Sequence, residues 1–196
     1  MFNLVIFGPP GAGKGTQSDK IIAKYNLKHI STGDMFRTHI KNETPLGKEV
    51  KSILDNGILV PDEITIKMLE EEMNLHQDVS GFILDGFPRT VPQAVALDQF
   101  LNTKSQMINL VLELVVSQDE IKERIAQRSK ISGRADDDAE KLIKRIDEYF
   151  QKTVHVLPYY ESQGKISKIN GIGEVESIFG SICDAIDDCL EPKASL

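Results

Sequence analysis

Short apolar runs alternate with amphipathic stretches along the chain. Several of the apolar runs lack the polar alternation of a half-exposed strand, which is typical of strands that are buried on both faces of a sheet. The expected strands span residues 2–7, 28–30, 81–85, 108–116 and 165–169. Apolar residues at helical spacing predict helices over 14–25, 90–103, 137–152 and 174–189. This order predicts an α/β protein with a central five-stranded parallel sheet flanked by helices.

Two segments do not fit the alternation. Residues 31–60 are helical in pattern but interrupted at Pro45 and Gly57, and residues 129–138 are short and polar. In open α/β sheets ligands bind at the carboxyl ends of the strands, so segments inserted there tend to cover a site. We therefore expect a single domain with a small helical insertion at 31–60 and a short lid at 129–138. The core then consists of residues 1–30, 61–128 and 139–196.

Residues 8–16 read Gly-Pro-Pro-Gly-Ala-Gly-Lys-Gly-Thr and lie between the first expected strand and the first expected helix. Small residues let backbone N–H groups converge on a phosphate, and the helix presents its positive N-terminal end. Lys14 adds a positive charge for the terminal phosphates. The residue after it is Gly15, so the hydroxyl of the general motif comes one position later, at Thr16. The segment predicts a phosphate-binding loop for a nucleoside triphosphate; the alternative is a glycine-rich turn that binds nothing.

Charge and composition narrow the choice of partners. The net charge is −7 and the isoelectric point is near 5.2, so no excess of Lys and Arg is available to bind a nucleic-acid backbone. No apolar run approaches the roughly 18 residues that cross a membrane, and no secretory signal is visible. We expect a cytoplasmic protein. Cys183 and Cys189 form no metal-binding pair, and we interpret them as buried or half-buried thiols.

Charged residues downstream of the loop suit phosphate chemistry. Asp85 ends an expected strand, where a carboxylate is the usual second group that holds Mg²⁺, often through water; the alternative is a turn or capping aspartate. Arginine suits phosphate because its planar guanidinium meets two oxygens at once. Arg124 and Arg128 are four residues apart and share a helix face, which is also the pattern of a solvated basic face. The cationic candidates are Lys14, Arg37, Arg89, Arg124, Arg128, Arg134 and Arg145.

Residues 85–93, Asp-Gly-Phe-Pro-Arg-Thr-Val-Pro-Gln, together with the loop at 8–16, closely resemble the adenylate kinase family. The resemblance extends from residue 2 to about 175, and position 15 is glycine in this family too. It implies a P-loop NTPase fold and the reversible, Mg²⁺-dependent transfer of a phosphoryl group from ATP to AMP, giving two ADP. Further matches are residues 31–37, 57–62 and 133–137, followed by Lys144-Arg145.

The resemblance also implies roles for individual residues. Lys14 and the amides of 11–16 (Gly11, Ala12, Gly13, Gly15 and Thr16) would hold the ATP phosphates, and the ATP adenine would lie between Arg124 and the backbone near Gly173. Lys14, Arg89, Arg128, Arg134 and Arg145 would act in catalysis, the last three around the transferred group. Arg37 and Arg89 would hold the acceptor's phosphate, with Arg134 and Arg145 also reaching the acceptor. Its base would be bound by Thr32, Ile58, Leu59, Val60, Gly86, Phe87, Pro88 and Gln93.

The chain departs from some members of the family. Only five residues separate Arg128 from Arg134, whereas bacterial relatives often carry a much longer lid, sometimes with zinc-binding cysteines. The chain therefore resembles the short-lid variants, and we expect no zinc. Asp136 and Asp137 would hold the short lid. The resemblance further implies a monomer whose partners are small-molecule nucleotides.

Two alternatives to phosphoryl transfer from ATP to AMP remain open. The first is the same chemistry on UMP or CMP, but relatives with that preference commonly have asparagine in place of Thr90 and no counterpart of Gln93. Thr32 and Gln93 favour AMP, because a carboxamide can pair with both a donor and an acceptor on an adenine edge. The second is a nucleotide-dependent switch that transfers no phosphate, which does not explain the second arginine set at Arg37 and Arg89.

Overall fold

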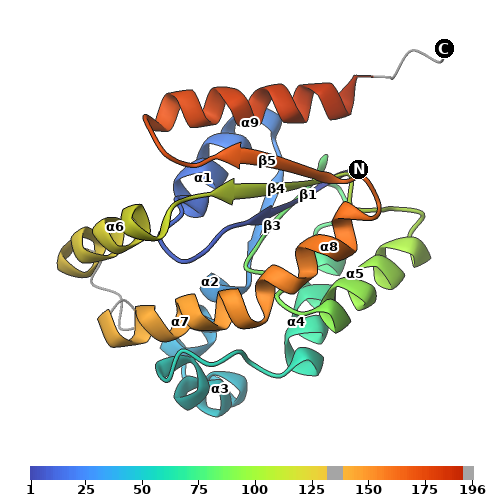
Figure 1. Cartoon of the computed structure of the whole chain (residues 1–196). Coiled ribbons are helices and arrows are strands. Elements are labelled where there is room, and N and C mark those ends of the chain that lie inside the picture. The colour runs from blue at the N-terminus through green and yellow to red at the C-terminus, as the bar shows by residue number, and fades with distance from the viewer. Residues whose placement is uncertain (132–138, 192–196) are drawn as a thin grey trace.

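The computed structural model describes residues 1–131 and 139–191, and a sheet of five parallel strands runs through this part of the chain (Figure 1). The strand order is β2-β3-β1-β4-β5, and each neighbouring pair is parallel. The predicted five-stranded parallel sheet is confirmed, with strand ends that differ by at most two residues. The strands are β1 Phe2–Phe7, β2 Lys28–Ser31, β3 Gly81–Asp85, β4 Leu110–Val115 and β5 Ile166–Asn170.

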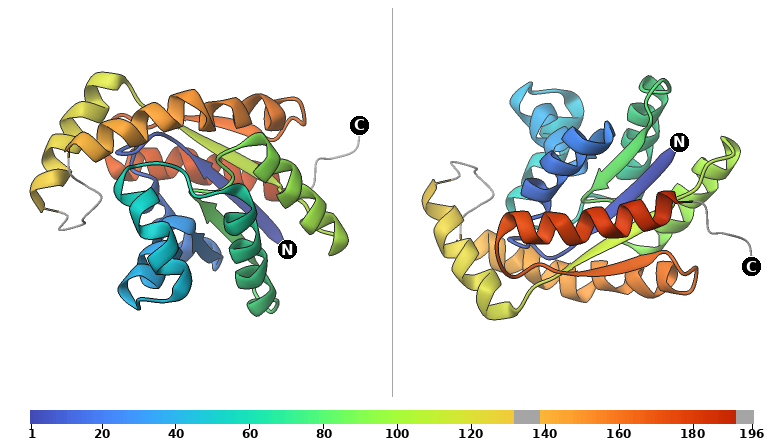
Figure 2. Two further views of the ribbon diagram at one scale, coloured as in Figure 1. Left: turned by 90° about the horizontal axis from the view of Figure 1, so that it is seen from below. Right: turned by 90° about the horizontal axis from the view of Figure 1, so that it is seen from above.

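Helices cover both faces of the sheet (Figures 1 and 2). One face packs against α1 and α9, and the other against α4, α5 and α8. The predicted helices at 14–25, 90–103 and 174–189 correspond to α1 Lys14–Tyr25, α5 Val91–Thr103 and α9 Val175–Leu190. Within the described ranges, no helix combines the length and the apolar character needed to cross a bilayer.

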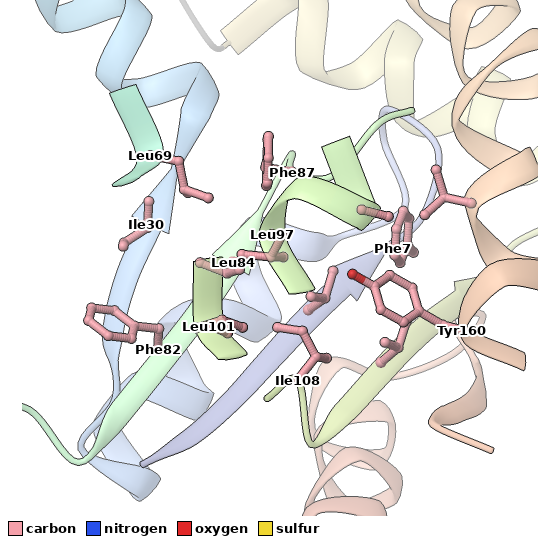
Figure 3. Packing of buried hydrophobic residues seen from close by; sticks show 14 of the residues in the cluster. Phe7, Ile30, Leu69, Phe82, Leu84, Phe87, Leu97, Leu101, Ile108 and Tyr160 are labelled. Carbon is pink, nitrogen blue, oxygen red and sulfur yellow. The ribbon is translucent and has the colours of Figure 1, made fainter. Parts of the chain in front are cut away.

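Strand β1 explains why the predicted strands are apolar at successive positions. Val5 and Phe7 pack against the helices of one face, whereas Leu4 and Ile6 pack against those of the other. A strand in the middle of such a sheet needs apolar side chains in both directions. Figure 3 shows one of the two layers, where side chains from β1 and β3 meet those of α5 and the ring of Tyr160. Tyr160, on α8 (Val156–Glu161), is fully buried.

Several helices have weaker sequence signals. The sequence analysis does not delimit α4 Asp62–Leu75, α6 Gln118–Ile131 or α8 Val156–Glu161. Helix α7 spans Ala139–Gln151, so the described part of the predicted helix 137–152 is confirmed. Residues 132–138, which include most of the predicted lid, Arg134 and the acidic run that starts at Asp136, lie outside the described residues.

The segment 31–60 folds as two short helices that share a small apolar cluster with α4 (Asp62–Leu75). Helix α2 spans Thr32–Lys41 and α3 spans Pro45–Asp55, so Pro45 begins the second helix at a position where its missing N–H costs nothing. Ser31 caps α2 and Thr44 caps α3. Phe36, Val50, Val60 and Met68 form the centre of the cluster beneath them.

The two cysteines differ in exposure. Cys183 is buried as expected, but the expectation is wrong for Cys189, which is exposed near the end of α9. Six residues of helix turn through about 600°, so the second thiol does not lie on the buried stripe that contains the first. Neither forms a disulfide with a described residue.

Gly81 allows β3 to start directly beside β1. A Cβ at this position would lie 1.8 Å from the backbone oxygen of Phe2, the residue that pairs with Gly81 where the β1–β3 pairing begins. We expect Gly81→Ala to lower the free energy of unfolding by about 3 kcal/mol, because neither backbone can move without breaking the sheet. Gly180→Ala is the matched control. Its Cβ would meet no atom within 4 Å in the middle of α9, so it should stabilise by about 0.5–1 kcal/mol. Chemical denaturation of both variants measures the difference.

Candidate functional site

The site lies where β1 and β3 end side by side. Parallel pairing sets Ile6 opposite Asp85, so the loop that follows β1 lies next to the segment that follows β3. An open cavity of about 950 Å³ lies at these carboxyl ends. This is the place at which open α/β sheets bind ligands. Two segments that are almost 80 residues apart in sequence therefore line one cavity.

The loop 8–16 leaves the start of α1 open to the cavity. Among the described residues, no side chain caps this helix, and its first turn contains no acidic residue. Gly13 adopts φ 93°, a left-handed conformation that glycine takes without strain. The Lys14 ammonium donates hydrogen bonds to the backbone oxygens of Gly8 at 2.7 Å and Pro9 at 3.2 Å. N–H groups at a helix start and a cation folded over the loop form an anion site.

Asp85 is a mostly buried carboxylate beside the loop. Its Oδ2 lies 3.8 Å from Nε2 of His29 on β2. Burial of the carboxyl acts to raise its pKa, but the contact with the His29 ring and the positive charges of Lys14 and Arg89 outweigh burial. The pKa of Asp85 is therefore held below its usual value, and the group is anionic at neutral pH.

The loop after β3 is tied to the segment 31–60. Thr32 donates its hydroxyl proton to the backbone oxygen of Gly86 at 2.8 Å, and Arg89 Nε donates to the same oxygen at 2.7 Å. Arg37, on α2, forms an ion pair with Asp34 one turn earlier. Arg37 and Arg89 both line the cavity. Two guanidinium groups from different elements therefore face the space opposite Lys14.

Gln93 is 2% exposed in the first turn of α5. Its Oε1 accepts a hydrogen bond from the backbone N–H of Arg89 at 2.7 Å, and its Nε2 donates to Oδ1 of Asp62 at 2.7 Å. Asp62 is the first residue of α4 and also accepts the hydroxyl proton of Thr90 through Oδ2 at 2.8 Å. Asp62 belongs to the run 57–62 that resembles the family, but the sequence pattern assigned it no role.

Arg124 joins three segments at the other end of the cavity. Its Nη1 donates to the backbone oxygen of Ala12 at 3.2 Å, and its Nη2 donates to that of Gly171 at 2.8 Å. Its Nε donates to Glu120 at 2.7 Å, one turn earlier on α6. The guanidinium thus lies between the loop 8–16 and the turn that leads from β5 into α9.

Most of the predicted site residues border the same cavity. Among the described residues, Thr32, Ile58, Val60 and Gln93 lie outside its lining, and all but Ile58 are buried. Arg134 lies outside the described residues, and nothing is described of the Arg128 side chain on α6. The predicted residues in the lining are Gly11, Ala12, Gly13, Lys14, Gly15, Thr16, Arg37, Leu59, Asp85, Gly86, Phe87, Pro88, Arg89, Arg124, Arg145 and Gly173.

Comparison with known proteins agrees with this arrangement. The family model for adenylate kinase matches residues 6–165. An adenylate kinase from Flavobacterium psychrophilum is 48% identical over 189 residues, which cover 96% of this chain and all of the relative. One from Bacteroides fragilis is 48% identical over 187 residues, 95% of this chain and 99% of the relative. One from Caulobacter vibrioides is 44% identical over 193 residues, 98% of this chain and 99% of the relative.

The chain belongs to the adenylate kinase family. The resemblance inferred from residues 8–16 and 85–93 is confirmed. In this member of the family, further side chains that the sequence analysis did not single out also line the cavity. They include His29, Asp34, Glu120, Glu123, Gln127, Glu148 and Tyr149. A local signal was present for Asp34 and Glu120, because an acidic residue three or four residues before an arginine on a helix is positioned to pair with it.

The ionised state of Asp85 makes a prediction about acid stability. Its unfolded pKa is near 3.8 and its folded pKa is lower, so its contribution to stability is complete above the unfolded value. As the pH falls through the folded pKa, the unfolded chain takes up the proton first and this contribution is lost. We expect Asp85→Asn to be less stable than the wild type at neutral pH, with a difference that shrinks below about pH 4. Urea denaturation at a series of pH values measures it; a difference that grows on acidification would contradict the assignment.

Proposed function

We propose that the protein transfers the γ-phosphoryl group of ATP to AMP, giving two ADP, and that the reaction is reversible and depends on Mg²⁺. Membership of the adenylate kinase family makes the protein a phosphotransferase that acts on nucleotides. The observation that carries the assignment is that two separate groups of cations line the cavity. It holds a phosphate-binding loop with Lys14 and, on the other side of the β1–β3 junction, the arginines Arg37 and Arg89.

The donor nucleotide would occupy the half of the cavity next to α1. Lys14 and the amides of residues 11–16 would bind its phosphates, and the adenine would lie between Arg124 and the backbone at Gly173. The position of Arg124 supports this role, because its hydrogen bonds to Ala12 and Gly171 hold the guanidinium beside both the loop 8–16 and the turn that contains Gly173. A planar cation held in this way presents a face to an aromatic ring.

The acceptor nucleotide would occupy the half next to α2 and the loop after β3. Arg37 and Arg89 would bind its phosphate, and Thr32, Gly86 and Gln93 would position its base, together with residues 58–60 and the turn at Phe87 and Pro88. Arg89 Nε is anchored on the oxygen of Gly86, which limits the freedom of the side chain before the phosphate arrives. Arg145, on α7, lines the cavity from a third side. With Arg128 and Arg134 it would surround the phosphoryl group in transfer.

Phosphoryl transfer needs alignment and charge neutralisation more than covalent help. Two anionic nucleotides repel each other, and the cations of the cavity lower that cost. The transferred group carries its charge on three oxygens, which guanidinium groups stabilise most when water is excluded. The insertion at 31–60 and the short lid at 129–138 would cover the site and exclude water during transfer. No general base is required of any residue in this mechanism.

The residues around Asp85 fit a magnesium ion. Mg²⁺ prefers oxygen ligands and keeps several of its waters, so one anionic carboxylate beside a phosphate-binding loop is sufficient protein support. Asp85 is anionic and lies in the cavity with the hydroxyl-bearing Thr16. When bound, the ion would neutralise charge on the ATP phosphates; Asp85 would hold it through water. Within the described residues, no cluster of three His, Cys, Asp or Glu side chains offers a closed metal site.

Cys183 and Cys189 form no disulfide among the described residues, which agrees with action in a reducing cytoplasm. We also assign the protein as a monomer, because both nucleotide subsites are built from residues of one chain.

An acceptor panel tests the assignment. ATP and Mg²⁺ are offered with AMP, CMP, UMP or GMP, and ADP formation is followed. We expect AMP to be the preferred acceptor, because the carboxamide of Gln93 matches a donor and an acceptor on an adenine edge. ADP formation only with CMP or UMP would overturn the choice of acceptor. ATP binding without transfer to any monophosphate would support a nucleotide-dependent switch instead.

A pair of substitutions tests the acceptor site. Arg89→Ala should lower kcat by two or more orders of magnitude with the fold intact, because it removes a charge from the transferring centre. Arg89→Lys keeps a positive charge but loses the planar fork, so we expect an intermediate loss. Thermal melting checks that both variants are folded. Turnover of Arg89→Ala within a few-fold of the wild type would show that the acceptor phosphate binds elsewhere.

A further inference from the structure

Asp62 has no role in the proposed phosphoryl transfer, yet it holds Gln93, the residue that we assign to the acceptor base. One of its oxygens accepts the Gln93 amide proton at 2.7 Å, and the other accepts the Thr90 hydroxyl proton at 2.8 Å. Thr90 in turn accepts the backbone N–H of Gln93 at 3.3 Å as the N-cap of α5. Asp62 begins α4 directly after the insertion 31–60, so the network joins the acceptor segment to the loop after β3.

The partners of Gln93 dictate the direction of its carboxamide. At Oε1 the partner is the backbone N–H of Arg89, which can only donate. At Nε2 the partner is a carboxylate, which can only accept. A carboxamide turned by 180° would place NH₂ against N–H and oxygen against oxygen. Both contacts would then be repulsive, inside a site where Gln93 is 2% exposed and water cannot replace them.

We propose that Asp62 is a positioning residue that locks the Gln93 carboxamide in the direction that accepts adenine and rejects 6-oxopurines. The proposal rests on the assignment of Gln93 to the acceptor base. Each polar atom of the carboxamide keeps one further hydrogen-bonding position, an N–H on Nε2 and a lone pair on Oε1. Adenine presents a donor at its 6-amino group and an acceptor at N1. Hypoxanthine and guanine present the reverse, an acceptor at O6 and a donor at N1.

A base whose pose is set by its bound phosphate therefore needs one direction of the carboxamide for AMP and the other for IMP or GMP. The locked direction of the carboxamide matches the hydrogen-bonding groups of adenine and not those of the 6-oxopurines. A polar mismatch of this kind inside a desolvated site discriminates strongly, because the unpaired groups are not compensated by water. Asp62 would thus set specificity without touching the substrate.

Asp62→Asn tests the lock while keeping the shape of the side chain. An asparagine can turn either its oxygen or its NH₂ toward Gln93, so the reversed carboxamide regains a partner at this position. We expect the ratio of kcat/KM for AMP to kcat/KM for IMP to fall about ten-fold. The KM for ATP should not change. IMP is the appropriate probe because its base differs from adenine only at the 1 and 6 positions.

Glu63→Gln is the matched control. It removes the same charge from the same first turn of α4, on an exposed residue next to Asp62. Its AMP to IMP ratio should equal that of the wild type. A merely structural role for Asp62 would lower the stability, or the turnover of both acceptors equally, and leave the ratio unchanged. An unchanged ratio in Asp62→Asn, or an equal shift in Glu63→Gln, would overturn the lock.

Gln93→Ala distinguishes a failure of the Asp62 lock from a failure of the assignment of Gln93 to the acceptor base. If Gln93 reads the base, the KM for AMP rises in this variant and the preference over IMP is lost. If the KM for AMP does not change, Gln93 does not contact the base, and both its assignment and the lock fail. If Gln93→Ala loses the preference while Asp62→Asn keeps it, only the lock fails.

Discussion

The parallel pairing of β1 with β3 is the constraint on which the site depends. It brings the carboxyl end of β1, followed by the loop 8–16, beside the carboxyl end of β3, with Asp85 and the turn that leads to Arg89. Both strands are buried on both faces, so neither can slip by one residue without turning its side chains to the wrong layer. The register Ile6 to Asp85 therefore holds the two halves of the site at a constant separation. The glycine at the start of β3 lets the strands approach closely enough.

The cavity gathers charges that would repel each other elsewhere. Lys14, Arg37, Arg89 and Arg124 are each held by a carbonyl oxygen or a carboxylate of the protein. These contacts keep the cations together in the absence of an anion and reduce the freedom that a bound nucleotide would have to remove. Asp85 adds a fixed negative charge among them. The cavity therefore contains a local group of positive charges, although the net charge of the chain is negative.

Elements with local sequence signals could be predicted, whereas features that depend on contacts between residues far apart in the chain could not. Strands β1 and β3 and helices α1 and α5 were predicted from the sequence because their signals are local: continuous apolar runs, a glycine-rich loop, and apolar residues at helical spacing. Helix α6 was not delimited, because its sequence is largely polar and its contacts are made by few apolar side chains. The role of Asp62 was invisible, because its partners Thr90 and Gln93 are about 30 residues away in sequence. The exposure of Cys189 was misjudged, because the buried stripe of α9 does not extend to it.

The sequence by itself determined the fold class and the family and indicated candidate groups for binding phosphate, because these depend on residue types at short spacings. Tertiary structure alone decided which groups line one cavity and which are buried next to it. Gln93 illustrates the difference. Its residue type identifies a group that can pair with a base, but the direction of its carboxamide is imposed by Arg89 and Asp62, which reach it from the preceding loop and from the start of α4. Hydrogen-bond direction depends on neighbours in space, and the fold supplies them.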